Sequence, residues 1–526
     1  MDNTNEVTKE NLIKEIKQRV LDKVLEESNA KLLIKLINQA DSINEAISIA
    51  GLGTMFKRTG LHFDYRMEKL SSDIKYFKKN EELSFHTDDT KPVHKLIIGD
   101  NYEALQNLLI QYRNSIDVIY IDPPYGKDSM GNFAATNYDN AITRDNLLSM
   151  LYPRLTLAKQ LLSEEGVIFC SIDDKNQAYV KCLFDEVFGE KNFIGTFIRK
   201  TVSQRAMAKI FNCQQDYCLM YANNRNYFDL VGKEKNFSYY SNPDNDENGN
   251  WKSSDPTMKK ASQNIFEIQN PYTKKIDLPP KGRGWAFSKV KFEEYVNNGK
   301  IIFKKEYKNN ERGFIYKTYM AEKDEYNLIN SLEYCDNKFL NQVSSKELKE
   351  IFNDNVFDYA KPLIFIQALI NQKKDNAIKV LDFFAGSGTT GQAVLELNKE
   401  DEGNRQFILC QLNEITDTAP NGIAYDVTSK RLKRVMTGEC YDGSKDFKWI
   451  ENNKPYGGNL DVYEINSVAD FETTEGKSAF DVIDETLYGQ EKFSTIQDKI
   501  DWVCRNFANT RKSIENSEEW EKKERK

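Results

Sequence analysis

The feature that most constrains the fold of this chain is a regular alternation of short apolar runs with amphipathic helical segments. Three such runs, at 95–98, 116–121 and 166–172, end in Gly, Asp or Pro residues that favour turns. Between the second and third runs, apolar residues recur on one helical face at Leu147, Leu151, Leu155, Ala158 and Leu162. Strands that alternate with helices in this way predict βαβ units and a parallel sheet.

The alternation stops near residue 226 and resumes after residue 361. The resumed pattern predicts a helix at 362–371, a strand at 379–384, a helix at 389–397, a strand at 406–412 and a helix at 427–435. The simplest account is one α/β domain with a doubly wound, mostly parallel sheet, interrupted by an insertion rich in Lys, Asn, Tyr and Gly. We therefore expect five segments: a helical N-terminal segment (1–95), the first part of the α/β domain (96–225), the insertion (226–355), the second part of the α/β domain (356–440) and a C-terminal domain (441–526).

Several classes of protein are excluded by what the sequence lacks. The longest apolar runs, around 166–171 and 362–370, are far shorter than the roughly 18 residues of a membrane span, and the first residues carry no signal-peptide pattern. We therefore expect a cytoplasmic protein with no membrane partner. No C-x-x-C pair occurs among the eight Cys, and all three His precede the first chemical motif, so we expect no metal site and no His-based triad.

Charge is unevenly distributed along the chain, whose net charge is −8. Between residues 256 and 320, 14 Lys and Arg stand against 6 Asp and Glu, which leaves the rest of the chain at −16. A basic segment in an acidic protein is typical of a surface that binds a phosphate backbone. The alternative is a solvated loop region with surplus Lys, and the charge alone favours that interpretation.

A glycine-rich turn follows the strand expected at 379–384 and precedes the helix expected from Thr389. Its glycines allow the backbone to approach a ligand closely, and the free N–H groups at the start of the helix favour negative charge. Gly386, Gly388 and Gly391 match the G-x-G-x-x-G pattern of dinucleotide sites, so an oxidoreductase that binds NAD is an alternative. No Lys follows the glycines, which excludes a P-loop. The form Phe-x-Gly-x-Gly suits S-adenosylmethionine, whose amino-acid end is a zwitterion.

The second motif, Asp122-Pro123-Pro124-Tyr125, comes directly after the apolar strand expected at 116–121. Ligands of open α/β sheets bind beyond the carboxyl ends of the strands. Two prolines fix φ and remove two N–H donors, which leaves rigid carbonyls that can only accept hydrogen bonds. This set suits a planar group with an exocyclic NH2, because Asp122 and the Pro123 carbonyl can accept both N–H bonds while Tyr125 stacks on the ring. An ordinary proline-containing turn is the alternative, which the flanking acid and tyrosine disfavour.

Together, the two motifs resemble the amino-methylating DNA methyltransferases, whose hallmarks are Asp-Pro-Pro-Tyr for the target base and Phe-x-Gly-x-Gly for S-adenosylmethionine. Asp-Pro-Pro-Tyr precedes the glycine turn here, with a long insertion between them, which is similar to the permuted β-class arrangement. More narrowly, the chain resembles the modification (Mod) subunit of type III restriction–modification systems. The likeness runs from about residue 96 to residue 434 and includes the segments 98–101, 171–174, 216–222, 279–285, 361–362 and 408–414.

The resemblance implies a Rossmann-like, permuted S-adenosylmethionine-dependent methyltransferase fold. It assigns catalysis to 96–225, target recognition to 226–355 and cofactor binding to 356–440. The implied function is methyl transfer from S-adenosylmethionine to N6 of a flipped-out adenine in double-stranded DNA. As a modification and recognition subunit, the protein would form a homodimer and pair with a helicase–nuclease restriction subunit.

The resemblance also implies roles for individual residues. The catalytic motif is Asp122, Pro123, Pro124 and Tyr125. The expected cofactor-binding residues are Asp100, Lys361, Asp382, Phe384, Gly386, Gly388, Thr389 and Gln411. The expected DNA-binding residues are Lys281, Arg283, Lys289, Lys291, Lys304 and Lys305. One departure concerns the cofactor ribose, which many family members bind with an acid after the glycine helix; here Gln411 or Glu414 must serve.

Four alternative functions stay open. Transfer to cytosine N4 is the same chemistry on another exocyclic amine, but those enzymes usually carry Ser in place of Asp122, which favours adenine. An oxidoreductase that uses NAD would leave the Asp122–Tyr125 motif unexplained. A catalytically silent DNA-binding subunit is disfavoured by an intact motif, and methylation of an RNA or protein amine is the fourth alternative.

Overall fold

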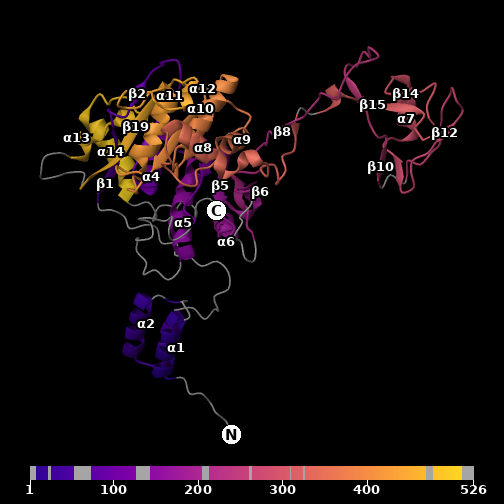
Figure 1. The fold of residues 1–526 in the computed structure, drawn as a ribbon. Coiled ribbons are helices and arrows are strands. Elements are labelled where there is room, and N and C mark those ends of the chain that lie inside the picture. The colour runs from indigo at the N-terminus through magenta and orange to yellow at the C-terminus, as the bar shows by residue number, and fades with distance from the viewer. Residues whose placement is uncertain are drawn as a thin grey trace, which may run out of the picture. The chain divides into compact units, whose positions relative to one another are not determined.

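The structure is a computed structural model that describes residues 8–21, 25, 27–52, 73–125, 143–203, 212–259, 263–308, 310–323, 326–469 and 478–511. The chain divides into two compact units (Figure 1). The first unit comprises Met1–Asp229 and Asn330–Lys526, and the second comprises Leu230–Ile329. The second unit is therefore inserted into the sequence of the first.

The first unit contains a ten-stranded sheet with a parallel centre. In spatial order its strands are β1 (Ile74–Lys79), β19 (Asn459–Val468), β3 (Val93–Ile98), β18 (Gln406–Gln411), β17 (Lys379–Asp382), β4 (Ile116–Ile121), β5 (Leu162–Ile172), β7 (Gln215–Ala222) and β6 (Phe193–Lys200), with β2 (Phe85–His86) paired to β19. From β19 to β5 every pair is parallel, whereas β1, β7 and β6 run antiparallel to their neighbours. The predicted mostly parallel sheet is confirmed.

Helices cover both faces of this sheet, which is the doubly wound arrangement. On one side α4 (Asn101–Tyr112), α5 (Thr143–Leu161) and α6 (Gln177–Phe188) pack in a row, and α14 (Ile496–Arg511) continues it beside β1. The second group contains α8 (Asn341–Phe352), α9 (Leu363–Ile370), α10 (Thr389–Asp401) and α11 (Lys430–Thr437), which follows a π-helical turn, η6 (Ala424–Ser429). None of the described helices is long and apolar enough to cross a membrane.

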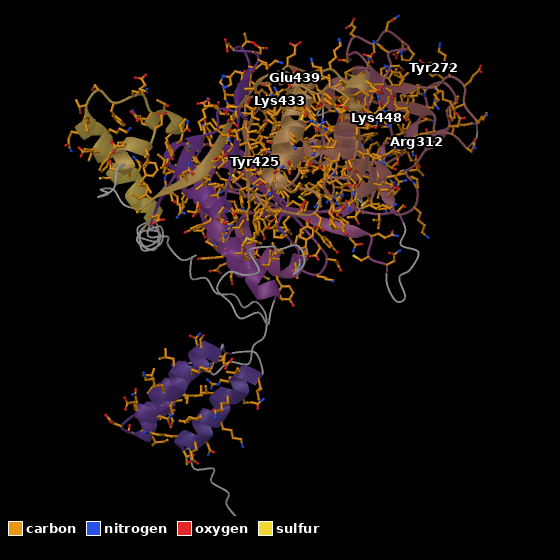
Figure 2. The ribbon with its side chains drawn as sticks, turned by 60° about the vertical axis from the view of Figure 1, so that its left-hand side comes forward. Tyr272, Arg312, Tyr425, Lys433, Glu439 and Lys448 are labelled. Carbon is orange, nitrogen blue, oxygen red and sulfur yellow. The ribbon has the colours of Figure 1, made fainter. Side chains whose placement is uncertain are left out.

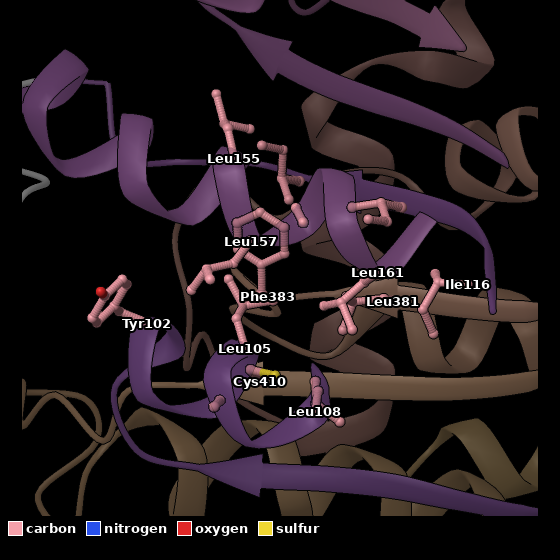
Figure 3. Packing of buried hydrophobic residues seen from close by; sticks show 14 of the residues in the cluster. Tyr102, Leu105, Leu108, Ile116, Leu155, Leu157, Leu161, Leu381, Phe383 and Cys410 are labelled. Atoms are coloured by element: carbon pink, nitrogen blue, oxygen red, sulfur yellow. The ribbon is translucent and has the colours of Figure 1, made fainter. Parts of the chain in front are cut away.

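Alternate residues of the central strands pack against the two groups of helices. Leu381 of β17 and Cys410 of β18 join the core formed with α4 and α5 (Figure 3). Leu409 faces the other group, since a Cβ placed on Gly391 of α10 would lie 3.1 Å from its Cδ1. A strand that is buried on both faces has to be apolar at nearly every position, as it is in β4.

The N-terminal segment contains the predicted helices and also two strands that were not predicted. The described helices α1 (Lys9–Leu21), α2 (Glu27–Gln39) and α3 (Ile43–Leu52) pack on one another and fit the expected helical segment. The expectation of mostly helical structure as far as residue 95 is wrong for 74–79 and 85–86, which form β1 and β2. Both strands pair with β19, which the C-terminal segment supplies. Periodicity within 1–95 carries no information about a partner that is distant in sequence.

The second unit has a core of its own. Its elements are an antiparallel sheet of β9 (Trp251–Ser253), β15 (Phe314–Tyr319) and β14 (Ile301–Phe303), the helix α7 (Lys289–Asn297), and the pairs β10 (Thr257–Lys259) with β13 (Arg283–Trp285), β11 (Ile268–Gln269) with β12 (Ile276–Asp277), and β8 (Lys233–Glu234) with β16 (Tyr326–Asn327). Trp285 stacks on Phe287, and Ile268, Ile301 and Phe314 complete the buried cluster. An inserted segment with its own apolar core can keep its structure independently of the rest of the chain.

The second unit ends at Ile329, earlier than the expected boundary at residue 355. Residues after it return to the edge of the large sheet, where the buried Arg199 of β6 joins three segments. Its guanidinium pairs with Asp216 of β7 and donates to the Phe339 carbonyl at 2.8 Å and to the Asn341 side chain at 2.9 Å. The rest of the expected division into five segments stays a prediction.

This buried ion pair gives a testable expectation for stability. Arg199→Met should lower the free energy of unfolding by about 3–5 kcal/mol, because it leaves the Asp216 carboxylate buried without its cation. Urea unfolding followed by circular dichroism measures the change. Lys445→Met is the matched control, since Lys445 and its partner Glu439 are exposed, and it should cost less than about 1 kcal/mol. Equal effects of the two substitutions would contradict the role of Arg199.

Candidate functional site

The two chemical motifs lie at the carboxyl edge of the parallel sheet, on neighbouring strands. β17 and β4 are parallel partners in which Leu381 pairs with Ile119. From β17 the chain continues through α10 to β18 on one side, and from β4 it continues through α5 to β5 on the other. This divergence of connections is the switch point at which open α/β sheets bind ligands. The motif 122–125 and the turn 384–388 therefore leave the sheet side by side.

Asp122, Tyr125 and Lys361 form a closed set of hydrogen bonds. The Tyr125 hydroxyl donates to Asp122 Oδ1. Lys361 Nζ donates to Asp122 Oδ2 at 2.5 Å and to the Tyr125 hydroxyl oxygen at 2.9 Å. The Lys361 side chain is 6% exposed and that of Asp122 is 23% exposed. Sequence analysis listed Lys361 among the cofactor-binding residues, whereas the structure joins it to the Asp-Pro-Pro-Tyr motif.

The electrostatics of this cluster keep the tyrosine protonated. Burial and the nearby Asp122 carboxylate raise the pKa of the Tyr125 hydroxyl well above its ordinary value. A side chain at the start of α6 holds the backbone of the motif, because Asn176 Nδ2 donates to the Tyr125 carbonyl at 2.7 Å. Asp173, which follows β5, accepts from both Asn176 Nδ2 and its backbone N–H. Asn176 was missed by sequence analysis, although the segment just before it was noted.

The glycine turn requires glycine at two positions. Gly386 and Gly388 have φ values of +51° and +78°, in the left-handed region that side chains disfavour. Space is short as well, because a Cβ on Gly386 would lie 3.1 Å from Phe357 Cζ, and one on Gly388 would lie 3.3 Å from Thr428 Cγ2. Gly388 is also the residue that precedes the first turn of α10. A side chain at either position would therefore be strained and would press on a neighbouring residue.

Side chains from the following strand and helices brace the turn. Gln411, at the end of β18, accepts from the Gly386 N–H at 2.7 Å and donates to the Leu412 carbonyl at 2.9 Å. Thr428 donates to the Gly386 carbonyl at 2.6 Å. Both polar atoms of the Gln411 amide are thus used within the protein, so its geometry favours support of the turn. Its expected contact with a cofactor stays a prediction.

Arg431 of α11 is a buried residue under the turn that sequence analysis did not identify. Its guanidinium donates to Ser387 Oγ at 3.1 Å, to Thr389 Oγ1 at 2.8 Å and to Gln392 Oε1 at 2.9 Å. Burial lowers its pKa to about 10, which leaves it charged at neutral pH. Thr389, an expected cofactor ligand, therefore turns its hydroxyl toward Arg431. No local pattern marks Arg431, because it lies 42 residues after Thr389.

Asp382 supports the turn from inside the sheet. Its side chain is buried, and it accepts from the Phe384 N–H at 3.0 Å and from the Thr390 hydroxyl at 2.5 Å. Burial and the charge of Asp122 raise the pKa of Asp382, and the two hydrogen bonds and the charge of Lys361 lower it; burial has the largest effect, so the resulting pKa is about 7. The protonation of Asp382 is thus sensitive to the charges of both Asp122 and Lys361.

Asp100 follows β3 at the same edge of the sheet. It caps α4 by accepting from the Tyr102 N–H at 2.7 Å, and it forms an ion pair with the buried Arg154 of α5 at 3.1 Å. Its neighbour Asn101 donates to the Phe383 carbonyl at 2.7 Å and accepts from Arg154. Asp100 is thereby fixed as a partly exposed carboxylate next to the glycine turn. Arg154 had no signal in the sequence beyond its place in an apolar helix.

The six expected DNA-binding residues all lie in the second unit. Lys281, Lys289, Lys291 and Lys305 are exposed. Arg283 and Lys304 are partly buried and already paired: Arg283 with Asp255 and Thr257, and Lys304 with Glu311. Two cations near them lie close to aromatic rings: Lys305 is 5.8 Å from the centre of the exposed Tyr272 ring, and Arg312 is 5.3 Å from the centre of the buried Trp285 ring. Figure 2 labels Tyr272 and Arg312. Within the described residues, no group of three or more His, Cys, Asp or Glu could hold a metal ion.

Comparison with known proteins gives matches over most of the first unit and all of the second. Residues 116–419 match a family model described as DNA methylase, and residues 9–118 match one described as an uncharacterised conserved protein. The chain is 31% identical to the StyLTI Mod subunit, a type III restriction-modification enzyme of Salmonella typhimurium, over 66% of this chain and 58% of that protein. It is 28% identical to the type II methyltransferase M.KpnI of Klebsiella pneumoniae, over 73% of this chain and 97% of that protein.

The extent of these matches differs between the two kinds of relative. The chain spans 58%, 62% and 65% of the lengths of three type III Mod subunits, but nearly all of M.KpnI. Among solved structures, the PvuII DNA methyltransferase, described as cytosine-N4-specific, is 11% identical, covers 67% of this chain and 95% of its own, and superposes with a TM-score of 0.33. This TM-score is too low to support an inference about the function of the chain.

The buried Asp382 gives an expectation for stability against pH. Its pKa in the folded protein, about 7, lies above the ordinary value of 3.8, so the folded state binds this proton more tightly than the unfolded state does. Stability from this group is therefore present at low pH and is lost as the pH rises toward 7. Between pH 5 and pH 8 the native protein should lose about 2–3 kcal/mol more than the Asp382→Asn variant does.

Urea unfolding at a series of pH values measures this difference. The exposed Asp89→Asn is the control, and its curve should run parallel to that of the native protein. Parallel curves for Asp382→Asn and the native protein would show that Asp382 does not titrate between these pH values.

Proposed function

Because the chain belongs to the DNA methylase family, whose model matches residues 116–419, we propose that it transfers a methyl group from S-adenosylmethionine to N6 of adenine in double-stranded DNA. We further propose that it acts as the modification and recognition subunit of a type III restriction–modification system. One observation carries the first proposal: the Asp122–Tyr125 motif and the glycine turn leave neighbouring parallel strands at the switch point of the sheet. A base held by the first motif would lie next to a donor held by the second.

The proposed role of Asp122 and Pro123 is to accept the two N–H bonds of the target amine. The lone pair of adenine N6 is delocalised into the ring, so the free amine is a poor nucleophile. Accepting both hydrogens would favour a pyramidal nitrogen with a free lone pair. As this lone pair took the methyl group, the C–S bond of the donor would break and its sulfur would become a neutral thioether, and the nitrogen would then release one proton to water. Tyr125 would stack on the base, with its hydroxyl held by Asp122 and Lys361. Positioning and fixed dipoles would supply most of the rate.

The residues around the glycine turn fit the proposed cofactor. S-adenosylmethionine supplies an electrophilic methyl group on a sulfonium. Its amino-acid end carries both charges, and the turn places two glycines without side chains, Gly386 and Gly388, beside the start of α10 and the fixed carboxylate of Asp100. Phe384, partly buried at the end of β17, offers an apolar face to the same region. Asp382 would not contact the cofactor; its role would be to fix the backbone of the turn through the hydrogen bond from the Phe384 N–H.

Adenine is preferred over cytosine because an acid precedes the two prolines. The family to which the chain belongs, DNA methylase, is defined without reference to the base that is methylated. Membership of this family removes the NAD-dependent oxidoreductase as an alternative, since the glycine pattern alone supported it.

We also propose that the second unit recognises DNA and that the target base is flipped out of the duplex. The unit has its own core and carries four exposed lysines from the basic segment. Flipping costs a few kcal/mol, which stacking on Tyr125 would partly offset. A homodimer, a helicase–nuclease partner and a cytoplasmic location complete the proposal, supported by the resemblance to type III Mod subunits.

A second candidate is a type II methyltransferase that acts without a restriction subunit in the same complex. It is favoured by the match to M.KpnI, a type II methyltransferase, which is 28% identical over 73% of this chain. Copurification with a coexpressed helicase–nuclease subunit would favour the first candidate, and a separate, freely active methyltransferase would favour the second.

Expression in a host free of DNA methylation tests the activity directly. Single-molecule sequencing of the host DNA should find N6-methyladenine at one short sequence motif, and mass analysis of digested nucleosides should find the same base. The strand asymmetry of the motif comes from the same data. N4-methylcytosine would overturn the choice of base, and unmodified DNA would overturn the proposed activity.

Two substitutions separate the roles of the two motifs. Asp122→Ala should reduce methyl transfer by at least 100-fold and leave the dissociation constant of S-adenosylmethionine within about twofold, because the proposed contact of the carboxylate is with the target amine and not with the cofactor. Gly386→Trp should abolish both, since the side chain would strain a turn with φ of +51° and meet Phe357. Initial rates with tritiated cofactor and calorimetric titration measure the two quantities.

Matched controls distinguish these effects from misfolding. Asp89→Ala and Gly51→Trp lie at exposed positions, and a Cβ on Gly51 meets nothing within 4 Å, so both variants should keep native activity and affinity. An Asp122→Ala protein that methylates DNA at the native rate would count decisively against the mechanism.

A further inference from the structure

We infer that Lys361 is the positioning residue of the Asp-Pro-Pro-Tyr motif: it holds the Asp122 carboxylate and the Tyr125 ring in the orientation that receives the target amine. The inference rests on the proposed function and extends it. It assigns Lys361 a role at the target base, where the resemblance had implied a contact with the cofactor.

The hydrogen bonds among the three side chains form a closed ring. Tyr125 donates its proton to Asp122 Oδ1, Lys361 donates one proton to Asp122 Oδ2, and Lys361 donates another to the Tyr125 oxygen. Each carboxylate oxygen thus receives one donor from the protein. A carboxylate has about four acceptor positions, so one on each oxygen stays available for an N–H bond of a substrate.

The same ring fixes the aromatic face. The Lys361 ammonium lies 5.1 Å from the centre of the Tyr125 ring, and the hydroxyl is held at two points. A phenol ring anchored through its hydroxyl keeps one plane, which is what stacking on a flat base requires. Lys361 therefore couples the group that accepts the amine to the group that stacks on the ring.

Lys361 is itself held rigidly by the chain around it. It comes directly before Pro362, the residue that caps α9, and directly after Ala360, whose carbonyl accepts from the Ser344 hydroxyl of α8 at 2.5 Å. With 6% of its side chain exposed, the ammonium is buried, and a buried cation needs a partner. Asp122 is the carboxylate that supplies it, so the two side chains are mutually dependent.

The charges indicate that this role is geometric. An ammonium at 2.5 Å neutralises much of the Asp122 charge, which weakens its attraction for a nitrogen that becomes positive during transfer. A second positive charge beside Asp122 cannot stabilise the positive charge that develops on the nitrogen, so Lys361 does not act through its charge. Its benefit lies in fixing the direction of the two remaining acceptor positions, and a misplacement of about 1 Å at such a site can cost 100-fold in rate.

Lys361→Met is the test, because it keeps the length of the side chain and removes the three donors. We expect kcat to fall about 100-fold, while the dissociation constant of S-adenosylmethionine, measured by calorimetry on the full chain, stays within twofold of the native value. Lys361→Arg should recover part of the rate, since it restores a cation and two donors. Lys373→Met is the matched control: Lys373 is 10% exposed and paired with Glu165, outside the site, so its kcat should be unchanged.

A second readout excludes a merely structural effect. The native protein should bind DNA with adenine at the target position more tightly than DNA with purine there, which lacks the amino group. Lys361→Met should reduce this preference at least fivefold, because Asp122 no longer points at the amine, whereas general damage would weaken both complexes equally. Should Lys361→Met fail to fold in thermal melts, Lys361→Gln supplies the same comparison, since it removes the cation and keeps a polar side chain at the buried position.

The outcomes separate this inference from the proposed function. A native protein that methylates no DNA overturns the proposed function. An active native protein with a Lys361→Met variant of native kcat overturns the positioning role and leaves the function intact. A variant that loses affinity for S-adenosylmethionine but keeps its kcat at saturation assigns Lys361 to the cofactor, and it also overturns the inference.

Discussion

The parallel pairing of β17 with β4 is the constraint on which the site depends. The two strands are far apart in the sequence, yet Leu381 pairs with Ile119, and their connections leave in opposite directions. A parallel pair has both carboxyl ends at one edge, so the segments that follow the two strands must meet there. A proline-fixed acceptor group and a glycine turn are thereby brought together at one edge of the sheet.

Buried cations hold this edge in place from three directions. Arg154 joins α5 to the start of α4, Arg431 joins α11 to the start of α10, and Lys361 joins the start of α9 to the catalytic motif. The side chains around each cation accept hydrogen bonds from it, which offsets the cost of burying a charge. Such networks favour one geometry strongly, because losing a single partner leaves a buried charge unpaired. The region that must be rigid for chemistry is also where these cations gather.

Much of the fold could be predicted from local patterns. The apolar run at 116–121 and the helix with Leu147, Leu151 and Leu155 on one face became β4 and α5, and the strand predicted at 379–384 became β17, which ends two residues earlier at Asp382. The prediction was wrong at 74–79 and 85–86, where strands form because β19 supplies a partner. The predicted end of the insertion, residue 355, lies 26 residues after the observed end of the second unit at Ile329. The residues that follow contact the large sheet, where Arg199 donates to the Phe339 carbonyl. In both places the deciding contact is distant in sequence.

The sequence by itself determined which functional groups are available. One motif contains an acid, two rigid carbonyls and an aromatic ring, and the other contains glycines where a backbone must come close to a ligand. These follow from residue type, because proline removes donors and glycine permits a positive φ wherever it occurs. Only the tertiary structure decided which side chains serve those motifs. Lys361, Gln411 and Arg431 could have faced solvent, cofactor or core, and the packing of α9, β18 and α11 on the sheet fixed their directions. A side chain's role depends on the partner it meets, and that partner is chosen by the fold.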